Sequence, residues 1–389
     1  MRIAVFQPRI FIRGGADRNM FEVFSRVKQR HEVRIFCGYY SPIGYKAEEG
    51  LDIDGVITRR NLNGRNIPGF GSLFLASVNE SIRRISKWRP DAIVLNNGYE
   101  YASLFNRRCE SAIVPYVGGT DWYKALSFFD NPTIWKIPGI SHLVSFASCS
   151  TQAVKTYHQF ENMKRLRTLL ALRRCAINIC VSAYVSRFLK RIDPKIETKV
   201  VNPGVDHKFF KPTFEDEDYV LNVTRIHPNK NPMLSVKSVE GTEHQLRICA
   251  NMERGFLPYE RYYQNLLSMK RDNVRIILDP PEDSLIHELQ RCSLFLSPAR
   301  NEGVPLVILE AMACGKFVIG HNTGAQGEFL NGCGITCGDD PKEWREQINR
   351  TMSNRSERIA LGRRAHSASM KYTWERTAKE IQETIEEFA

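Results

Sequence analysis

The sequence predicts an α/β protein with two parallel β-sheets in succession, and three observations support this. Strand-like runs alternate with segments of helical periodicity over most of the 389 residues, which is the order typical of β-α-β units. Near residue 210, a stretch rich in Pro, Gly and acidic residues interrupts the alternation, which then starts again. A chain of this length also exceeds what one hydrophobic core usually holds. We therefore expect two domains.

The first half begins with a predicted strand at 2–7 (RIAVFQ), followed by a glycine-containing segment. Four apolar residues at helical spacing then predict a helix with one buried face: Met20, Phe21, Phe24 and Val27. Further strands are expected at 31–38, 91–95, 112–117 and 176–181. Ser182 can cap a helix that runs through 183–192.

The second half repeats the alternation, with strands expected at 218–226, 244–250, 273–279, 292–298 and 317–321. The predicted boundaries are an N-terminal domain at 1–202, a linker at 203–217, a C-terminal domain at 218–372 and an amphipathic helix at 373–389, opened by Thr373 as a cap. Because β-α-β order makes parallel sheets with crossover helices, we expect two Rossmann-like domains that face each other across a cleft.

The net charge of +12 belongs to the first half of the chain. Residues 1–200 contain 31 Lys and Arg against 16 Asp and Glu, whereas 201–389 contain 24 against 27. No zinc-finger spacing, RNP-like strand or basic-region helix accompanies this charge, which argues against a nucleic-acid partner. The basic residues gather in two helix-like segments, 81–90 and 161–175, where the second mixes them with Leu and Met. Such a segment can lie on an anionic membrane surface, or it can be a solvated helix with its apolar stripe in the core.

Several absences indicate a cytoplasmic protein, peripheral at most at the inner membrane face. The N-terminus lacks the apolar stretch of a signal peptide. The longest apolar segment, 168–189, contains Arg173, Arg174 and Arg187, so no membrane-spanning helix is expected. The ten Cys are scattered without a disulfide framework, as in a reducing compartment. Cys333 and Cys337 have no second pair of ligands at metal spacing, and no metal site is expected.

Residues 299–320 (ARNEGVPLVILEAMACGKFVIG) place two carboxylates, Glu302 and Glu310, in a nearly apolar run. Pro305 suits the first position of a helix at 305–314, whose free N-terminal amides make an anion site. Glu310 would lie about 7–8 Å along that helix. A buried carboxylate without a partner costs several kcal/mol, so Glu310 needs hydroxyl groups or a cation, and a nearby Lys or Arg would also suffice.

A second candidate segment, NVTRIHPNKNP (222–232), follows a predicted strand and holds Arg225 and Lys230 five residues apart. Two cations at the carboxyl end of a strand can neutralise the negative charge of an anion without a metal. Taken alone, the pair is more often surface charge.

The segment EGVPLVILEAMACGKFVIGHNTGAQGE (302–328) resembles the Glu-x7-Glu signature of retaining GT-B glycosyltransferases, family 4 (glycosyl transferases group 1). The resemblance implies that Glu310 binds the ribose hydroxyls of a nucleotide. It also implies that Glu302, with the backbone at Gly303, Val304 and Leu306, contacts the donor sugar. NVTRIHPNKNP resembles the Arg–Lys segment of the same family, in which both cations hold the diphosphate. The implied catalytic residues are Arg225, Lys230 and Glu302.

Other segments extend the resemblance over most of the chain. VVNPGVDHKFF (200–210) is similar to the linker of the family, and YTWERTAKEI (372–381) to its C-terminal helix, which typically packs back on the first domain. RGGADR (13–18) resembles its N-terminal glycine-rich loop, which implies that Gly14 and Gly15 let the backbone approach the phosphates and sugar. A plain tight turn is the alternative for this Gly-Gly pair.

The sequence also departs from the pattern of the family. Thr224 and Asn231 stand where Gly or Ser and Gly are usual, and 247–254 (RICANMER) replaces a Gly-x-Gly-Pro turn. No His follows the strand at 112–117, where Asp121 is found instead. Asp121 and Asn97 are the acceptor-side candidates, although Asp121 could equally be a turn residue. His227 and His321 are expected near the donor in structural roles.

The resemblance implies a retaining, metal-independent hexosyltransferase without a cofactor. Its donor would be a nucleoside-diphosphate sugar of the UDP or GDP type, and its acceptor a glycan or lipid-linked molecule in cell-surface polysaccharide or glycoconjugate synthesis. The altered glycines and the absent His leave open a non-catalytic GT-B protein that binds a nucleotide sugar or glycan. A redox enzyme with a dinucleotide site at Gly14 and Gly15 is a weaker alternative, because no G-x-G-x-x-G follows the first strand.

Overall fold

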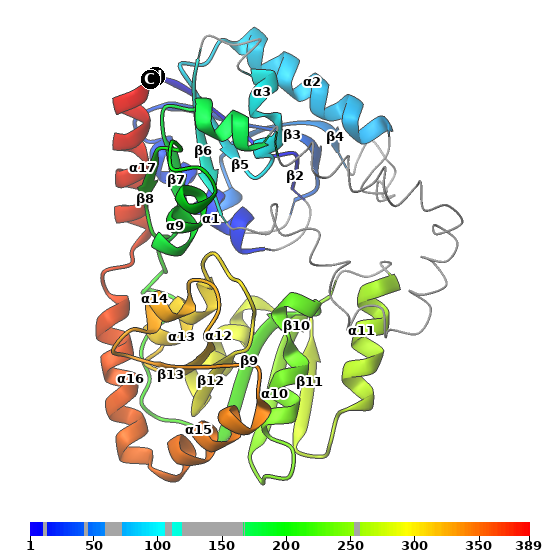
Figure 1. Cartoon of the computed structure of the whole chain (residues 1–389), viewed down its shortest axis with the longest axis vertical. Coiled ribbons are helices and arrows are strands. Elements are labelled where there is room, and N and C mark those ends of the chain that lie inside the picture. The colour runs from blue at the N-terminus through cyan, green and yellow to red at the C-terminus, as the bar shows by residue number, and fades with distance from the viewer. Residues whose placement is uncertain are drawn as a thin grey trace. The chain divides into compact units, whose positions relative to one another are not determined.

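A computed structural model describes the chain except for residues 11–13, 43–45, 59–71, 106–110, 119–165, 167 and 253–256 (Figure 1). The described residues form two compact units. The first contains those of Met1–Tyr123 and Ser150–Pro203 together with Trp374–Ala389, and the second contains Gly204–Thr373. The boundary at Pro203 falls within the stretch expected as a linker.

The first unit is built on a parallel sheet with the order β2-β3-β1-β5-β6-β7-β8, and β4 pairs with β3. The strands are β1 (Arg2–Phe6), β2 (Arg9–Ile10), β3 (Glu32–Tyr40), β4 (Asp52–Thr58), β5 (Ala92–Asn96), β6 (Ala112–Val117), β7 (Asn178–Cys180) and β8 (Thr198–Val200). Strand β1 lies centrally, with Ile3 beside Val33 on one side and Ala92 on the other. Its residues 3–6 are fully buried, as expected for a strand covered on both faces.

Helices cover this sheet, and the expected buried helix face is confirmed. The helices of the unit are α1 (Gly15–Val27), α2 (Ser72–Trp88), α3 (Ala102–Phe105), α9 (Ala183–Ile192) and α17 (Trp374–Phe388), with 3-10 turns η1 (Lys46–Glu48) and η2 (Tyr99–Tyr101). The four apolar residues that predict α1 are completely buried. Ser182 caps α9 by accepting a hydrogen bond from the backbone N–H of Val185 at 3.3 Å, as predicted.

The C-terminal helix α17 belongs to the first unit, although residues 204–373 separate it in sequence from the rest of that unit. It packs against α1. Arg26 pairs with Glu375 at 3.1 Å, and His31 lies 2.8 Å from Glu386. The hydroxyl of Thr377 donates to the carbonyl of Asn202 at 2.9 Å.

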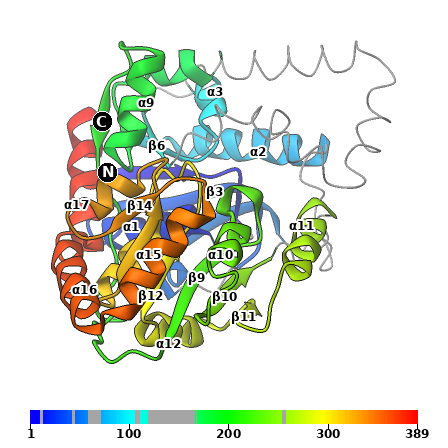
Figure 2. The ribbon, with the colours of Figure 1, turned by 60° about the horizontal axis from the view of Figure 1, so that its bottom comes forward.

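The second unit contains a parallel sheet with the order β11-β10-β9-β12-β13-β14 (Figure 2). Its strands are β9 (Tyr219–Arg225), β10 (Gln245–Asn251), β11 (Val274–Leu278), β12 (Leu294–Ser297), β13 (Phe317–His321) and β14 (Ile335–Cys337). The chain moves outward from β9 to β11, then returns to place β12 on the other side of β9 and moves outward again. The strand order therefore reverses between β9 and β12.

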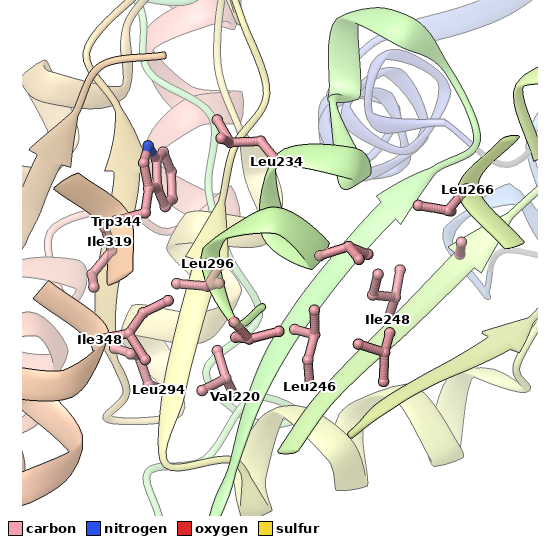
Figure 3. Packing of buried hydrophobic residues seen from close by; sticks show 14 of the residues in the cluster. Val220, Leu234, Leu246, Ile248, Leu266, Leu294, Leu296, Ile319, Trp344 and Ile348 are labelled. Atoms are coloured by element: carbon pink, nitrogen blue, oxygen red, sulfur yellow. The ribbon is translucent and has the colours of Figure 1, made fainter. Parts of the chain in front are cut away.

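The core of the second unit fills the space between this sheet and its helices (Figure 3). The helices are α10 (Pro232–Ser238), α11 (Leu257–Ser268), α12 (Glu282–Arg291), α13 (Leu306–Ala313), α14 (Gln326–Leu330), α15 (Pro341–Ser353) and α16 (Arg355–Ser369), and η3 (Pro228–Lys230) is a 3-10 turn. Helices α10 and α15 pack against each other over one face. Trp344 and Ile348 of α15 meet Leu296 and Ile319 of the sheet there, and all four are fully buried.

The predicted strands are confirmed to within about two residues, whereas β2, β4, β8 and β14 are missed. One helix boundary is wrong. Pro305 is not the first helical residue but the N-cap of α13, with φ −88° and ψ 91°, and the helix begins at Leu306. The ψ of Pro305 lies far from the helical value, so Pro305 is outside the helix.

Helix α16 approaches the end of α13 closely at one glycine. A Cβ atom on Gly362 would lie 2.1 Å from the carbonyl oxygen of Gly315, which is backbone and cannot move aside. Alanine in a helix interior normally stabilises by about 1 kcal/mol relative to glycine. Here we expect Gly362→Ala to destabilise by about 1–3 kcal/mol, because α16 must be displaced.

The urea midpoint of unfolding measures this effect. Gly327→Ala is the matched control, since a Cβ on Gly327 in α14 would lie 3.9 Å from its nearest neighbour, a methyl carbon of Thr336. Gly327→Ala should be neutral or slightly stabilising. A Gly362→Ala protein as stable as the wild type would show that α13 and α16 are not packed this closely.

No helix in the described part of the chain is both long and apolar enough to cross a membrane.

Candidate functional site

The carboxyl ends of β9 and β12 define the candidate site, because the strand order of the second sheet reverses between them. In open parallel sheets, ligands bind at such a reversal, outside the carboxyl ends of the strands. Strand β9 ends at Arg225, and β12 ends at Ser297, five residues before Glu302. Both segments singled out in the sequence therefore meet at the position where a parallel sheet is expected to bind its ligand.

Arg225 is the last residue of β9, and Lys230 lies on the compact turn that follows the strand. Arg225 is exposed at the strand end. The ring Nδ1 of His227 caps the turn η3 by accepting from the backbone N–H of Asn229 at 3.0 Å. Asn231 then has φ 51° and ψ 43°, a left-handed conformation that Asn adopts more readily than other residues with a side chain. Asn231, in place of the usual Gly, thus adopts a conformation that favours glycine.

His227 adds no charge beside these two cations. Burial, together with the charges of Arg225 and Lys230, lowers the pKa of His227 to about 4. The neutral ring can therefore cap η3 through Nδ1 at physiological pH.

We expect the acid sensitivity of folding to depend on His227. Since the native pKa is depressed from 6.5 to about 4, the stabilising contribution is complete above pH 6.5 and is lost as the pH falls toward 4. The free energy of unfolding should fall by up to about 1.4 kcal/mol per pH unit in that window, because only the unfolded state takes up the proton. His227→Asn keeps a capping oxygen and should remove this component from the pH dependence. Identical slopes for both proteins in urea unfolding between pH 4 and 6.5 would contradict it.

The loop after β12 meets the loop after β9 through two contacts, an ion pair and a backbone hydrogen bond. The Nζ atom of Lys230 forms an ion pair with Oε1 of Glu302. The backbone N–H of Arg300 donates to the carbonyl of Asn229 at 2.7 Å. Both charged side chains of the pair are largely shielded from solvent. Two of the predicted site residues are thus in direct contact.

A third loop, after β13, supports the main chain of Glu302. The backbone N–H of Ala325 donates to the carbonyl of Glu302 at 2.8 Å. Gly324 has φ +79°, and a Cβ there would lie 2.6 Å from the backbone N and O of Glu302, so only glycine fits. The buried Gln326 links the loop after β12 to the end of β13. It donates to the carbonyl of Ala299 and accepts from the N–H of His321.

Glu310 lies in the second turn of α13 and is only 5 % exposed. Of the other predicted residues beside Glu302, Gly303 is buried, while Val304 and Leu306 are half-buried. All of these residues lie in the second unit, with Arg225 and Lys230.

The predicted residues in the first unit follow two of its strands. Gly14 is the N-cap of α1, and Gly15 is its first residue. Gly14 has φ −144° and ψ 157°, an extended conformation that any residue adopts. Asn97 follows β5 with φ 57°. Asp121 lies outside the described residues, as does the end of the 247–254 segment beyond Met252.

Several polar residues near these positions were missed in the sequence. In the first unit, the buried Asn96 at the end of β5 donates to Gln7, and the buried Asn19 of α1 donates to the hydroxyl of Tyr116 at 2.7 Å. In the second unit, the missed residues are Arg300, Thr323, Gly324, Gln326 and Asp339. For Arg300, Thr323 and Asp339 the signal was a polar residue two or three positions after an apolar strand, which marks the carboxyl edge of a parallel sheet but does not say which residues meet there. Gly324 gave no such signal.

Cys333 and Cys337 are free and buried, and the thiol of Cys333 donates to the carbonyl of Phe329 at 3.3 Å. Among the residues that the structure describes, no group of three or more His, Cys, Asp or Glu side chains could hold a metal ion.

Two Rossmann-like domains in one chain define the GT-B class of fold, which confirms the fold class predicted from the sequence. Residues 205–368, nearly all of the second unit, match the family model described as "Glycosyl transferases group 1". The chain is also similar over its whole length to sucrose-phosphate synthase from Thermosynechococcus elongatus, with a TM-score of 0.78, 14 % identity and coverage of 99 % of this chain and 98 % of that one. For the Anabaena protein HepE in complex with UDP and glucose, the TM-score is 0.71 at 15 % identity, with 100 % of both chains covered.

Curated relatives match over shorter regions. An uncharacterized glycosyltransferase of Methanocaldococcus jannaschii is 23 % identical over 219 residues, which cover 54 % of this chain and 59 % of the relative. A D-inositol 3-phosphate glycosyltransferase of Corynebacterium urealyticum is 32 % identical over 114 residues, or 28 % of this chain and 27 % of the relative. The aligned regions thus span less than two thirds of these relatives.

Proposed function

We propose that the chain is a retaining glycosyltransferase that moves a hexose from a nucleoside-diphosphate sugar to a glycan or lipid-linked acceptor. The observation that carries the proposal is the contact between Lys230 and Glu302 at the reversal of strand order in the second sheet. A cation for a diphosphate and a carboxylate for sugar hydroxyls lie side by side there. The match of residues 205–368 to a glycosyltransferase family model supports the same activity.

The four charged side chains would bind different parts of the donor. Arg225 and Lys230 would bind the diphosphate, since Arg225 ends β9, Lys230 lies on the turn that follows, and His227 between them is neutral. Glu302 and the backbone of Gly303, Val304 and Leu306 would contact the sugar. Glu310, buried in α13, would accept hydrogen bonds from the ribose hydroxyls.

The chemical step would need charge stabilisation more than a separate base. As the bond between the anomeric carbon and the phosphate oxygen breaks, negative charge grows on the diphosphate, and Arg225 and Lys230 would stabilise it. The acceptor oxygen would attack from the same face. Its proton would pass to the phosphate oxygen that leaves, which retains the anomeric configuration and balances the charge. Neither step needs a cofactor or a bound metal.

We infer that the donor nucleotide is uridine diphosphate. The solved HepE structures contain UDP or UDP-glucose, and that protein shares the fold of this chain. The sequence leaves UDP and GDP donors open, so this choice rests on the likeness to HepE.

The site assignment is tested by transfer and donor hydrolysis with UDP-sugars and GDP-sugars. Arg225→Ala and Glu302→Ala should each remove most turnover while the proteins stay folded. Unchanged turnover in both variants would contradict the assignment. Turnover of any donor by the wild type would exclude the non-catalytic alternative. One motive for that alternative was Asn231 in place of the usual Gly, and Asn231 adopts the left-handed conformation that favours glycine.

We further propose that the first unit approaches a lipid-linked acceptor at an anionic membrane surface, on the cytoplasmic side. Leu166 and residues 168–174 are helical. Leu166 is 58 % and Leu170 43 % exposed, and Arg173 and Arg174 are exposed beside them. These four positions share one face of a helix by their spacing, while Thr168, Ala171 and Leu172 on the opposite face are buried. Exposed leucines beside arginines fit the acyl and anionic parts of a lipid surface.

Flotation with vesicles of phosphatidylcholine, with and without phosphatidylglycerol, tests this surface. The wild type should float with the anionic vesicles, and a Leu166→Gln/Leu170→Gln variant should float several-fold less. Leu257→Gln is the control, because Leu257 is 56 % exposed in the second unit. Equal loss in both variants, or no binding by the wild type, would contradict the membrane proposal and leave the donor site untouched.

A further inference from the structure

Three loops at the carboxyl edge of the second sheet form a closed ring of hydrogen bonds next to Glu302. Arg300 Nε donates to Oδ1 of Asp339 at 2.7 Å, and His321 Nε2 lies 2.9 Å from the same oxygen. On the other side of the His321 imidazole, Nδ1 lies 2.9 Å from the hydroxyl of Thr323. That hydroxyl accepts from the backbone N–H of Asn301 at 3.1 Å. Because Arg300 and Asn301 are consecutive, the ring closes through their peptide bond; we call these five residues the His321 ring.

The donors and acceptors in the His321 ring assign its protons. The backbone N–H of Thr323 donates to Nδ1 of His321 at 3.2 Å, so Nδ1 is an acceptor and the imidazole proton is on Nε2. Nε2–H then donates to Asp339. The Thr323 hydroxyl accepts from Asn301 and gives its own proton to Nδ1. Every link therefore has one donor and one acceptor when the imidazole proton is on Nε2.

The charge of Asp339 fits this assignment. Burial raises the pKa of Asp339, but hydrogen bonds from His321 and Arg300 and the charge of Arg300 outweigh it, and the net pKa lies below its usual value. An ionised carboxylate accepts both hydrogen bonds. His321 itself is 1 % exposed, whereas the Asp339 side chain is 64 % exposed. The ring thus runs from a buried imidazole to a carboxylate at the surface.

The segment that the ring fixes leads directly to Glu302. Asn301 has φ 57°, a conformation uncommon for a residue with a side chain. The N–H of Arg300 reaches the carbonyl of Asn229, the neighbour of Lys230. The two ring contacts to Arg300 and Asn301 therefore hold the main chain just before Glu302 on the side facing Lys230.

We propose that His321, Thr323 and Asp339 are positioning residues that set the main chain at Glu302 for the donor sugar. They act through Arg300 and Asn301 and do not touch the substrate. This inference rests on the proposed function, since it assigns a role toward the sugar of the donor. It assigns no role in holding the nucleotide, which falls to Arg225, Lys230 and Glu310.

Thr323→Val tests the ring, because valine has the shape of threonine and lacks the hydroxyl that links Asn301 to His321. Thr323→Ser, which keeps the hydroxyl, is the matched control. Hydrogen exchange at the Asn301 amide should be at least tenfold faster in Thr323→Val and near the wild-type rate in Thr323→Ser. Transfer should fall about tenfold in kcat for Thr323→Val, with the affinity for UDP alone unchanged and activity restored in Thr323→Ser.

Asp339→Asn is the second variant. The Asp339 side chain is 64 % exposed, so this substitution leaves the core intact, and it should lower kcat in the same way. Wild-type exchange and wild-type transfer in Thr323→Val, or equal losses in the Val and Ser variants, would overturn the inference. A wild type that binds no nucleotide sugar would instead refute the proposed function, and hydrogen exchange would still report whether the ring orders Asn301.

Discussion

Replacing Lys230 with alanine is expected to lower sugar transfer about 100- to 1,000-fold, the usual effect of removing one group that stabilises charge in a transition state. Lys230 follows β9 at the reversal of strand order and already contacts Glu302 in the structure. Its charge would meet the diphosphate as the bond to the sugar breaks. Because part of that interaction also exists in the ground state, the affinity for the free diphosphate should fall as well.

Steady-state transfer kinetics and calorimetric titration with UDP measure the two effects of Lys230→Ala. Lys270→Ala is the matched control, an exposed lysine of the same unit that lies after α11. It should leave both quantities at the wild-type level. Full activity in Lys230→Ala would exclude Lys230 from the site, and equal losses in both variants would show that the effect is one of overall charge.

Glu302→Gln is expected to separate binding from transfer. In the structure Glu302 holds Lys230, so an incoming diphosphate must compete with this carboxylate for the lysine. For a separation of about 8 Å between the Glu302 carboxylate and the diphosphate, and an effective dielectric constant near 20, the repulsion between two unit charges is about 2 kcal/mol. Removing the charge should therefore tighten UDP binding at least about fivefold, a factor that corresponds to about 1 kcal/mol. Transfer should fall about 100-fold, because the carboxylate no longer accepts hydrogen bonds from the sugar.

The opposite signs make this variant informative. A structural defect would weaken UDP binding and transfer together, whereas the ion pair predicts that they change in opposite directions. Asp283→Asn, an exposed carboxylate at the start of α12, controls for the loss of one negative charge in the same unit. Weaker UDP binding in Glu302→Gln would contradict the competition between Glu302 and the diphosphate.

The buried parallel strands were predictable because each is a short apolar run bounded by turn residues. The strands β8 (TKV) and β14 (ITC) were missed, since three residues give no periodicity. Strand β4 (DIDGVIT) was missed because Asp and Gly interrupt its apolar pattern. Pro305 was placed one position too far into α13 because its missing N–H suits the first turn, while its ψ of 91° is visible only in the structure.

A long motif and a shorter one directed the prediction of the candidate site. Arg225, Lys230, Glu302 and Glu310 were identified from two segments, and the structure brings Lys230 and Glu302 into contact. The His321 ring was not predictable, because Asp339 and Arg300 are 39 residues apart in the sequence and meet only through strand pairing. The importance of Gly324 was hidden for the same reason, since its constraint comes from the backbone of Glu302.

We propose above all that the edge of the second sheet between β9 and β12 binds a nucleoside diphosphate through Lys230. Thermal unfolding of the wild type and of Lys230→Ala with UDP, GDP and ADP tests it most directly. At a nucleotide concentration of about 100 times Kd, binding stabilises the native state by about 2.7 kcal/mol. We expect a clear rise in Tm for the wild type with UDP and little or none for Lys230→Ala. No rise with any of the three nucleotides at millimolar concentration, or an equal rise in both proteins, would contradict it.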